Sequence, residues 1–330
     1  MAVSENYLYA CHSGIQKAVR RGDLNLTKTC FDAMWDAGGK HRNFIRWRLP
    51  VLVNEDVHFM IGELAEFVQK IYNIGDQQWL RNEYKKFLYK ITLTNKAKDT
   101  EGLYFTAKKK YIKNMDNYPE LIIMDNYLKQ IQDNDPKTVV EHLYEGMLKE
   151  IKTDYEKNAL NFLRKRLYKG GMLDDQYACL AGMILIGTRG LDREAIRAHW
   201  ISRVKDSSKN SEKPRYVPLP WYVYDMHTRL GKQAIKLFLN SNAQAYEISE
   251  AKFKRMFFQI ESAYIPEDLW TLVELKPGFS HTCFESPWWR TFIINDLPFN
   301  SKKTVDEVLD FWNSTIREEL KDCIYRIVSK

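Results

Sequence analysis

The feature that most constrains the fold of this chain is a helical spacing of apolar residues that begins near the N-terminus. In the first such segment, apolar residues recur every three or four positions, at Leu8, Cys11, Ile15 and Val19. Residues at this spacing lie on one face of an α-helix, which completes a turn every ~3.6 residues. Ser4 before the segment and Gly22 after it are residue types that start and end helices. The pattern predicts a helix between them, with Lys17, Arg20 and Arg21 away from the apolar stripe.

Similar spacing predicts further helices in the first third of the chain. Asn25 is the predicted cap of a second helix, which ends at Gly38–Gly39. A third helix is predicted from about Arg42 to Leu52, interrupted or kinked near Pro50, which lacks an amide donor. Two more apolar stripes lie at residues 64–71 and 80–91. These segments predict a set of short helices that pack on one another.

The helical pattern continues in the rest of the chain. Residues 177–186 are strongly apolar, which is typical of a helix at the centre of a core. We therefore predict an all-α, multi-helix globular protein with an N-terminal helical domain and a second helical region. The predicted divisions are a helical domain at 1–115, a helical region at 138–204, a loop or linker at 205–220 and an aromatic-rich helical region at 221–330.

Composition excludes two broad classes of protein. With 330 residues and 45% apolar content, the chain can bury one large core or two smaller ones, so it is not a disordered protein. No stretch approaches the roughly 18 uncharged apolar residues of a membrane span, and Met1–Gly22 lacks the apolar run of a signal peptide. We expect a soluble protein in the cytoplasm, associated with the nucleoid, or in the host cytoplasm if the source is a virus.

The positive charge is concentrated in one segment. Residues 85–113 hold nine lysines against Asp99 and Glu101, so this segment carries the whole formal net charge of +7. Such a patch is typical of proteins that bind the phosphate backbone of nucleic acids, although a solvated lysine face that keeps the protein soluble is the alternative. The candidate nucleic-acid-binding residues are Lys96, Lys98, Lys108, Lys109, Lys110 and Lys113, with a second cluster at Arg164, Lys165 and Arg166.

Three N-terminal stretches share their residue types, order and spacing with one known helical module. They are residues 15–23 (IQKAVRRGD), 44–49 (FIRWRL) and 53–57 (VNEDV), and residues 68–75 and 88–100 continue the series. Over about residues 4–110 the sequence resembles the C-terminal, oligomer-forming domain of the MgsA/RarA and Werner-helicase-interacting-protein group of clamp-loader-like AAA+ ATPases.

The resemblance implies a setting in DNA replication or repair, replication proteins as partners, and self-assembly into a homo-oligomer through the N-terminal helices. The sequence departs from the family pattern at Trp47, which separates two arginines, and at Pro50. No phosphate-binding loop is present, because the nearest glycine spacing, Gly182 to Gly187, is followed by Thr188 and Arg189 instead of lysine and serine or threonine. We expect no ATP hydrolysis by this chain.

The charged residues within the resembling stretches are expected to be structural. Arg46 or Arg48 can pair with Glu55 or Asp56, because a charge inside a packed helical core must be compensated. Nothing nearby supplies the pattern of a nucleophile or of a set of metal ligands.

The best catalytic candidates in the chain are Asp225 and His227. They are suited to act as a base and its orienting partner, or as two ligands of a metal with an unseen third group. Residues two apart on a helix or turn do not face each other, so a structural turn with hydrogen-bonded Asp and His is the favoured interpretation. The five cysteines are scattered without metal-site spacing, and we expect neither a metal nor a cofactor.

The sequence as a whole predicts a non-enzymatic accessory protein of DNA replication or repair. It binds DNA, single-stranded or at a junction, through the lysine patch and assembles with itself. One alternative is a protein-interaction module that docks on or inhibits a replication enzyme or a single-strand-binding protein. The other is a metal-dependent nucleic-acid enzyme that uses Asp225 and His227.

Overall fold

The structure of the protein is a computed structural model. It describes residues 3–72, 74–94, 96, 100, 103–104, 107, 119–168, 173–197, 219–246, 248–265 and 304–329, with the backbone alone at 168, 173–175 and 243–246. These residues contain thirteen α-helices and no β-strand, so the predicted all-α fold is confirmed for them. Within the same ranges, no helix is both long and apolar enough to cross a bilayer.

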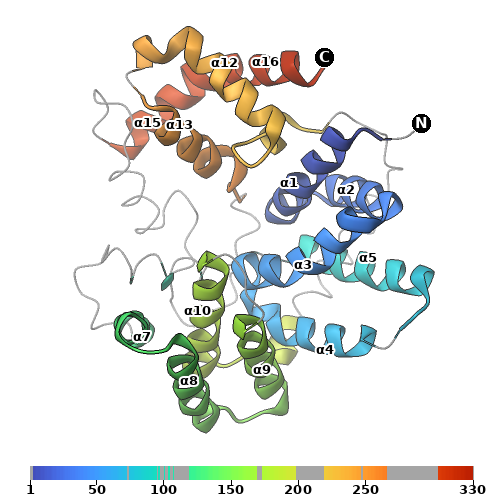
Figure 1. Cartoon of the computed structure of the whole chain (residues 1–330), viewed down its shortest axis with the longest axis vertical. Coiled ribbons are helices and arrows are strands. Elements are labelled where there is room, and N and C mark those ends of the chain that lie inside the picture. Colours follow the sequence, from blue (N-terminus) through green and yellow to red (C-terminus); the bar gives the residue numbers. More distant parts are fainter. Residues whose placement is uncertain are drawn as a thin grey trace. The chain divides into compact units, whose positions relative to one another are not determined.

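The described residues divide into two units, whose helices are labelled in Figure 1. The first unit contains residues 3–46, 219–265 and 304–329, and the second contains the described residues between 47 and 197. The division thus differs from the linear one at 1–115, 138–204 and 221–330, because the first two helices group with the C-terminal part of the chain. Of the predicted linker at 205–220, all but the last two residues lie outside the described ranges.

The first unit combines two N-terminal helices with a C-terminal set. α1 (Glu5–Arg21) packs against α2 (Leu24–Ala37) and also contacts the 3₁₀ turn η3 (Trp221–Val223). In the C-terminal set, α12 packs along α16 and contacts α13. The elements of this set are α12 (Arg229–Tyr246), α13 (Glu250–Phe257), the π-helical turn η4 (Phe258–Ser262), α15 (Val305–Phe311), the π-helical turn η6 (Trp312–Ile316) and α16 (Arg317–Val328).

Buried aromatic rings form the core of the C-terminal set. Phe253, Phe257 and Trp312 are fully buried, and the ring centroid of Trp312 lies 5.6 Å from that of Phe253 and 6.3 Å from that of Phe257. The indole N–H of Trp312 donates to the carboxylate of Glu261 at 2.8 Å, so the polar edge of the ring is satisfied. Burial of each phenylalanine contributes about 1.5–3 kcal/mol to stability.

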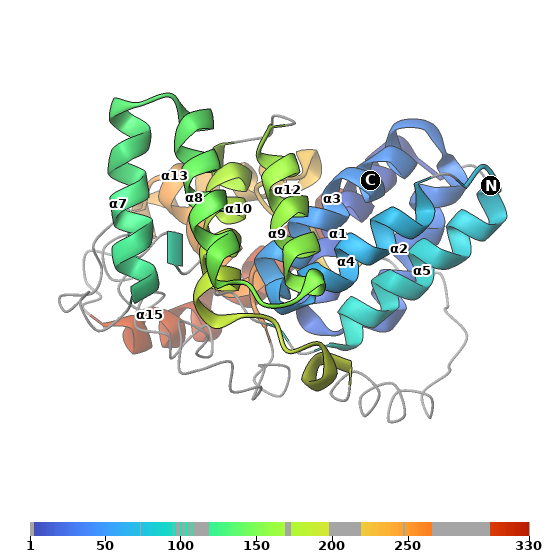
Figure 2. The ribbon, with the colours of Figure 1, turned by 90° about the horizontal axis from the view of Figure 1, so that it is seen from below.

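The second unit is organised around α10. α10 (Leu173–Arg189) contacts α7, α8 and α9, and α9 in turn contacts α4; Figures 1 and 2 show α8, α9 and α10 side by side. Residues 178–186 are all buried, in agreement with the predicted central position of this segment. The other elements are η1 (His58–Met60), α4 (Ile61–Ile71), α5 (Gln77–Leu93), α7 (Pro119–Asp133), α8 (Pro136–Glu150) and α9 (Asp154–Tyr168), together with the end of α3 (Gly39–Asp56), which starts in the first unit.

The ends of the first three helices test the sequence signals directly. The hydroxyl of Ser4 accepts from the amide of Tyr7 at 3.2 Å, and Gly22 ends α1 with a φ of +65°, as predicted. The cap of α2 is Asp23 and not Asn25, because the Asp23 carboxylate accepts from the third amide of the helix, that of Leu26, at 2.8 Å. Of the two predicted alternatives at Pro50, interruption is wrong, because α3 continues through Pro50 to Asp56.

Close packing of α4 on α9 depends on the absence of a side chain at Gly62. A methyl group at this position would lie 2.6 and 2.7 Å from ring carbons of Tyr155, which is 7% exposed and has little room to move. We expect Gly62→Ala to lower the free energy of unfolding by about 1–3 kcal/mol through overpacking. Chemical denaturation followed by circular dichroism measures the change.

Gly146→Ala is the matched control, since Gly146 lies in α8 and a methyl group there would have no neighbour within 4 Å among the described residues. This substitution is expected to stabilise the same unit by about 0.5–1 kcal/mol, because alanine favours the helix. Equal effects of the two substitutions would contradict the packing of Tyr155 on Gly62.

Candidate functional site

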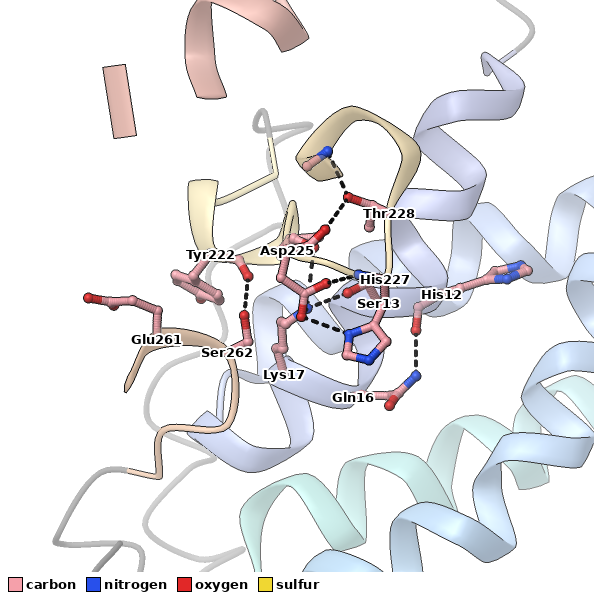
Figure 3. Close-up of polar contacts among 12 residues, drawn as sticks. His12, Ser13, Gln16, Lys17, Tyr222, Asp225, His227, Thr228, Glu261 and Ser262 are labelled. Carbon is pink, nitrogen blue, oxygen red and sulfur yellow. Dashed lines mark hydrogen bonds and ion pairs between the residues drawn. The ribbon is translucent and has the colours of Figure 1, made fainter. Parts of the chain in front are cut away.

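A buried ion pair joins α1 to the turn that precedes α12 (Figure 3). The ammonium of Lys17 lies 2.8 Å from Oδ2 of Asp225, and the two side chains are 3% and 0% exposed. The ammonium also donates to the hydroxyl of Ser13 and to the carbonyl of Val223, the latter at 3.3 Å. These partners use all three donors of the lysine. The charge is therefore fully compensated inside the protein.

Asp225 organises its own turn. Its Oδ1 accepts from the backbone amide of His227 at 2.9 Å, its Oδ2 lies 3.1 Å from Nδ1 of His227, and its carbonyl accepts from the hydroxyl of Thr228 at 3.2 Å. The expectation that Asp225 and His227 do not face each other is wrong, because the residues lie in a tight turn that folds the imidazole back onto the carboxylate. The favoured interpretation, a turn with hydrogen-bonded Asp and His, is what the structure contains.

The charge of Asp225 is stabilised by its neighbours. Burial alone raises the pKa of a carboxyl group, but the ammonium of Lys17 and the hydrogen bond from His227 outweigh it and hold the pKa of Asp225 well below its usual range. Asp225 is consequently an anion at neutral pH. Burial has the opposite sign for the lysine and lowers the pKa of Lys17, an effect that Asp225 opposes.

This arrangement is better suited to structure than to catalysis. The carboxylate that orients His227 already forms a buried ion pair with Lys17. The hydroxyl of Ser13 is occupied by the same ammonium and is buried. In the part of the chain that the structure describes, no three His, Cys, Asp or Glu residues are placed to hold a metal ion.

Lys17 is the residue of this cluster that sequence reasoning missed. The apolar stripe of α1 places Lys17 and Arg20 outside the core, yet they are 2% and 4% exposed. The sequence signal that could have predicted this burial is a second face of small residues in α1. A methyl group at Gly14 would lie 2.7 Å from Sγ of Cys30 and 3.5 Å from Val223, so this face lets α2 and η3 approach closely.

Of the lysine patch, one candidate residue is described, and it is buried. Lys96 has 0% exposure, and its ammonium donates to the carbonyls of Ile91 and Thr92, each at 2.9 Å, and to that of Thr94. A lysine in this position stabilises the C-terminal carbonyls of α5 and does not reach a phosphate on the surface. This corrects the prediction for Lys96. The other candidates, Lys98, Lys108, Lys109, Lys110 and Lys113, lie outside the described residues.

The second basic cluster lies on α9, and its three residues have different surroundings. Arg164 pairs with Glu141 at 3.0 Å and covers the ring of Tyr144. Lys165 is exposed. Arg166 donates to the backbone carbonyl of Trp47 at 3.0 Å, and the side chain of Trp47 is 60% exposed. The fold thus brings Arg166 to the backbone of Trp47, a residue that is largely exposed.

The predicted structural ion network is present in part. Nη2 of Arg48 lies 3.5 Å from Oε2 of Glu55, which is one of the predicted pairings. Asp56 is fully buried, as a compensated acid in a packed region is expected to be. Arg46 forms no ion pair with any residue in the described ranges, and its Nε is buried without a hydrogen bond.

Comparison with known proteins does not add a function for these residues. No family model matches the chain, and neither a curated protein nor a solved structure matches it. The function is therefore argued from the residues of this chain.

The Lys17–Asp225 pair leads to a prediction for stability. Lys17→Met and Asp225→Asn each leave one buried charge without its partner, so each is expected to cost about 3–5 kcal/mol of the free energy of unfolding. The double variant removes both charges and keeps an oxygen for the amide of His227, so it is expected to recover a large part of this loss. Urea denaturation of all four proteins gives the coupling energy.

The matched control is the solvent-accessible pair Lys321–Glu318, whose side chains are 36% and 71% exposed. The same cycle with Lys321→Met and Glu318→Gln is expected to give a much smaller coupling energy, because solvent screens the pair. A coupling of similar size at the two sites would show that the buried pair does not hold α1 to the turn.

A histidine pair in the first unit predicts a pH effect. Nε2 of His12 lies 2.9 Å from Nδ1 of His41, whose Nε2 is 3.3 Å from the carboxylate of Glu5, which also pairs with Lys40. Burial, followed by the charge of His41, lowers the pKa of His12 from its ordinary 6.5 to about 4. Between pH 4 and pH 6.5, His12 therefore binds a proton more readily in the unfolded chain than in the folded protein.

The stabilising effect of neutral His12 is complete above pH 6.5 and is lost as the pH falls towards 4. We expect His12→Gln to reduce, by about 1 kcal/mol, the loss of unfolding free energy over this pH range. The effect is no larger because His12 is partly solvated. Denaturation midpoints at several pH values measure it. Parallel pH profiles for the two proteins would contradict the assignment.

Proposed function

We propose that this protein is a non-enzymatic accessory factor of DNA replication or repair that binds single-stranded nucleic acid. The observation that carries the binding is the exposed indole of Trp47 next to basic residues of α9. The replication setting is supported by the sequence resemblance of about residues 4–110 alone.

Trp47 is unusual because large aromatic side chains are normally buried. In the described ranges, Trp35, Trp221 and Trp312 are at most 7% exposed and Trp79 is half-buried, whereas Trp47 is 60% exposed. Its position in α3, one turn before Pro50, keeps the indole on a rigid element. An indole held in this way can stack on a nucleic-acid base, an interaction worth about 1–3 kcal/mol.

The surroundings of Trp47 supply positive charge for the phosphates. Arg166 is anchored to the Trp47 carbonyl and leaves part of its guanidinium available, and the neighbouring Lys165 is exposed. Aromatic rings that alternate with arginine and lysine are the arrangement by which single strands are bound without sequence preference.

Self-assembly through the N-terminal helices is a second part of the proposal and rests on the resemblance. Light scattering coupled to size-exclusion chromatography measures the mass in solution. A mass equal to that of one 39.1 kDa chain at all concentrations would remove this part while leaving nucleic-acid binding untouched.

Replacement of Trp47 tests the binding proposal. We expect Trp47→Ala to weaken the binding of a fluorescent oligothymidylate by about tenfold, because the loss of one stacked base costs about 1–3 kcal/mol, and Trp47→Phe to retain most of the affinity. Fluorescence anisotropy at low salt measures the Kd. The effect should be larger for single-stranded than for duplex DNA.

Tyr72→Ala is the matched control, because Tyr72 is an aromatic residue with 83% exposure in the same unit. This variant is expected to bind like the wild type. No binding of single-stranded DNA or RNA by the wild type at about 20 mM salt would reject the proposal and favour a protein-interaction module. An equal loss in both variants would reject the role of Trp47.

A further inference from the structure

α12 carries an exposed basic face, and the helix contains no acidic residue. Its 18 residues include no aspartate and no glutamate, and Arg229, Lys232 and Lys236 are all exposed. At positions i, i+3 and i+7, these three cations lie within one narrow sector of the helix surface, spread over about 10 Å along its axis. His227, which is 54% exposed, closely precedes the helix.

The cations of α12 differ from several other solvent-accessible lysines in the described ranges. Those lysines are paired with an acid one turn away, as Lys129 is with Asp125, Lys157 with Asp154 and Lys321 with Glu318. Arg229 and Lys232 form no such pair within the described ranges.

Glu250, an acid that senses the charge of this face, does not neutralise it. Glu250, at the start of α13, is bound by Lys254, which is the largest cause of its lowered pKa, and the charge of Lys236 is a smaller cause. One carboxylate therefore faces two ammonium groups.

The opposite side of α12 is occupied. Ala234, Ile235, Phe238 and Leu239 are buried where α12 packs along α16 and contacts α13. A helix that binds at a lipid surface inserts its apolar face into the membrane, and this face is not available here. Leu237 is the one exposed large apolar residue on α12 that the structure describes. The accessible surface suits a hydrophilic polyanion.

We propose that the α12 face, Arg229, Lys232 and Lys236, is a binding site for the phosphate backbone of a nucleic acid. This inference rests on the proposed function and assigns it a contact surface in the first unit. Successive charges of one DNA strand are about 3.4 Å apart along the axis, so three cations spread over about 10 Å match two or three phosphates. The contact is electrostatic and independent of base sequence.

The test compares two triple variants with the same change in net charge. Arg229→Gln, Lys232→Gln and Lys236→Gln together remove the α12 face, and Lys129→Gln, Lys157→Gln and Lys321→Gln together remove three lysines that are paired with acids. Glutamine favours helices, so both variants are expected to fold. Binding of a duplex and of an oligothymidylate is measured by anisotropy over a series of salt concentrations.

We expect the α12 variant to bind duplex DNA at least about tenfold more weakly at about 0.1 M salt. The slope of log Kobs against log salt is expected to fall by about 2–3, because each lost phosphate contact reduces it by about 0.9. The control variant is expected to keep the slope and affinity of the wild type. Equal slopes for the α12 variant and the control would overturn the inference while leaving the proposed function in place.

The remaining outcomes separate the two proposals. If the wild type binds no nucleic acid at about 20 mM salt, both fail. If Trp47→Ala binds normally while the α12 variant does not, the role of Trp47 fails and the inference stands. If the α12 variant binds DNA like the control but loses binding to phosphatidylserine vesicles, the face binds lipid and the nucleic-acid inference is overturned.

Discussion

The buried ion pair between Lys17 and Asp225 is the interaction on which the first unit depends. Two charges have been removed from water, a change that costs several kcal/mol per ion unless each is compensated inside the protein. Compensation is complete because the ammonium has three acceptors and the carboxylate also binds the turn of His227. Val223, one of those acceptors, is 206 positions from Lys17, so the pair forms only when these distant parts of the chain meet.

The consequences of this pair extend to α12. Asp225 lies in the turn before the helix, and the backbone of that turn approaches Gly231 so closely that no side chain could be accommodated there. The start of α12 and the direction of its basic face therefore follow from the position of the turn on α1. Lys17 and Asp225 are themselves buried, but by fixing the turn they position the exposed cations of α12, several residues further along the chain.

The basic residues in the described ranges fall into two groups. Many basic residues are neutralised locally, either by an acid one turn away or, as for Lys96, by the carbonyls at the end of a helix. Among the described residues, the exposed cations without an ion pair include Arg229 and Lys232 of α12 and Lys165 of α9. A phosphate can bind to these residues at a low cost of desolvation, because no existing ion pair has to be broken.

Sequence patterns predicted several elements correctly, and two of the wrong predictions depend on where the backbone turns. Ser4 and Gly22 act through atoms of their own helix, so the limits of α1 could be predicted from neighbouring residues. Asn25 is the predicted cap of α2 and Asp23 the actual one, because both residue types are suitable and the choice depends on where the helix begins. For Asp225 and His227, the spacing excludes contact on a helix, but the backbone forms a tight turn.

Periodicity and composition alone predict the all-α class, the central position of α10 and the excess of positive charge. Which of the charges are accessible depends on how distant segments pack together. Lys17 and Lys96 carry the same side chain as Lys232, yet two are buried and one is exposed. The reason is physical: a lysine can be buried only where acceptors compensate its charge, and for Lys17 the decisive acceptor comes from a distant part of the chain.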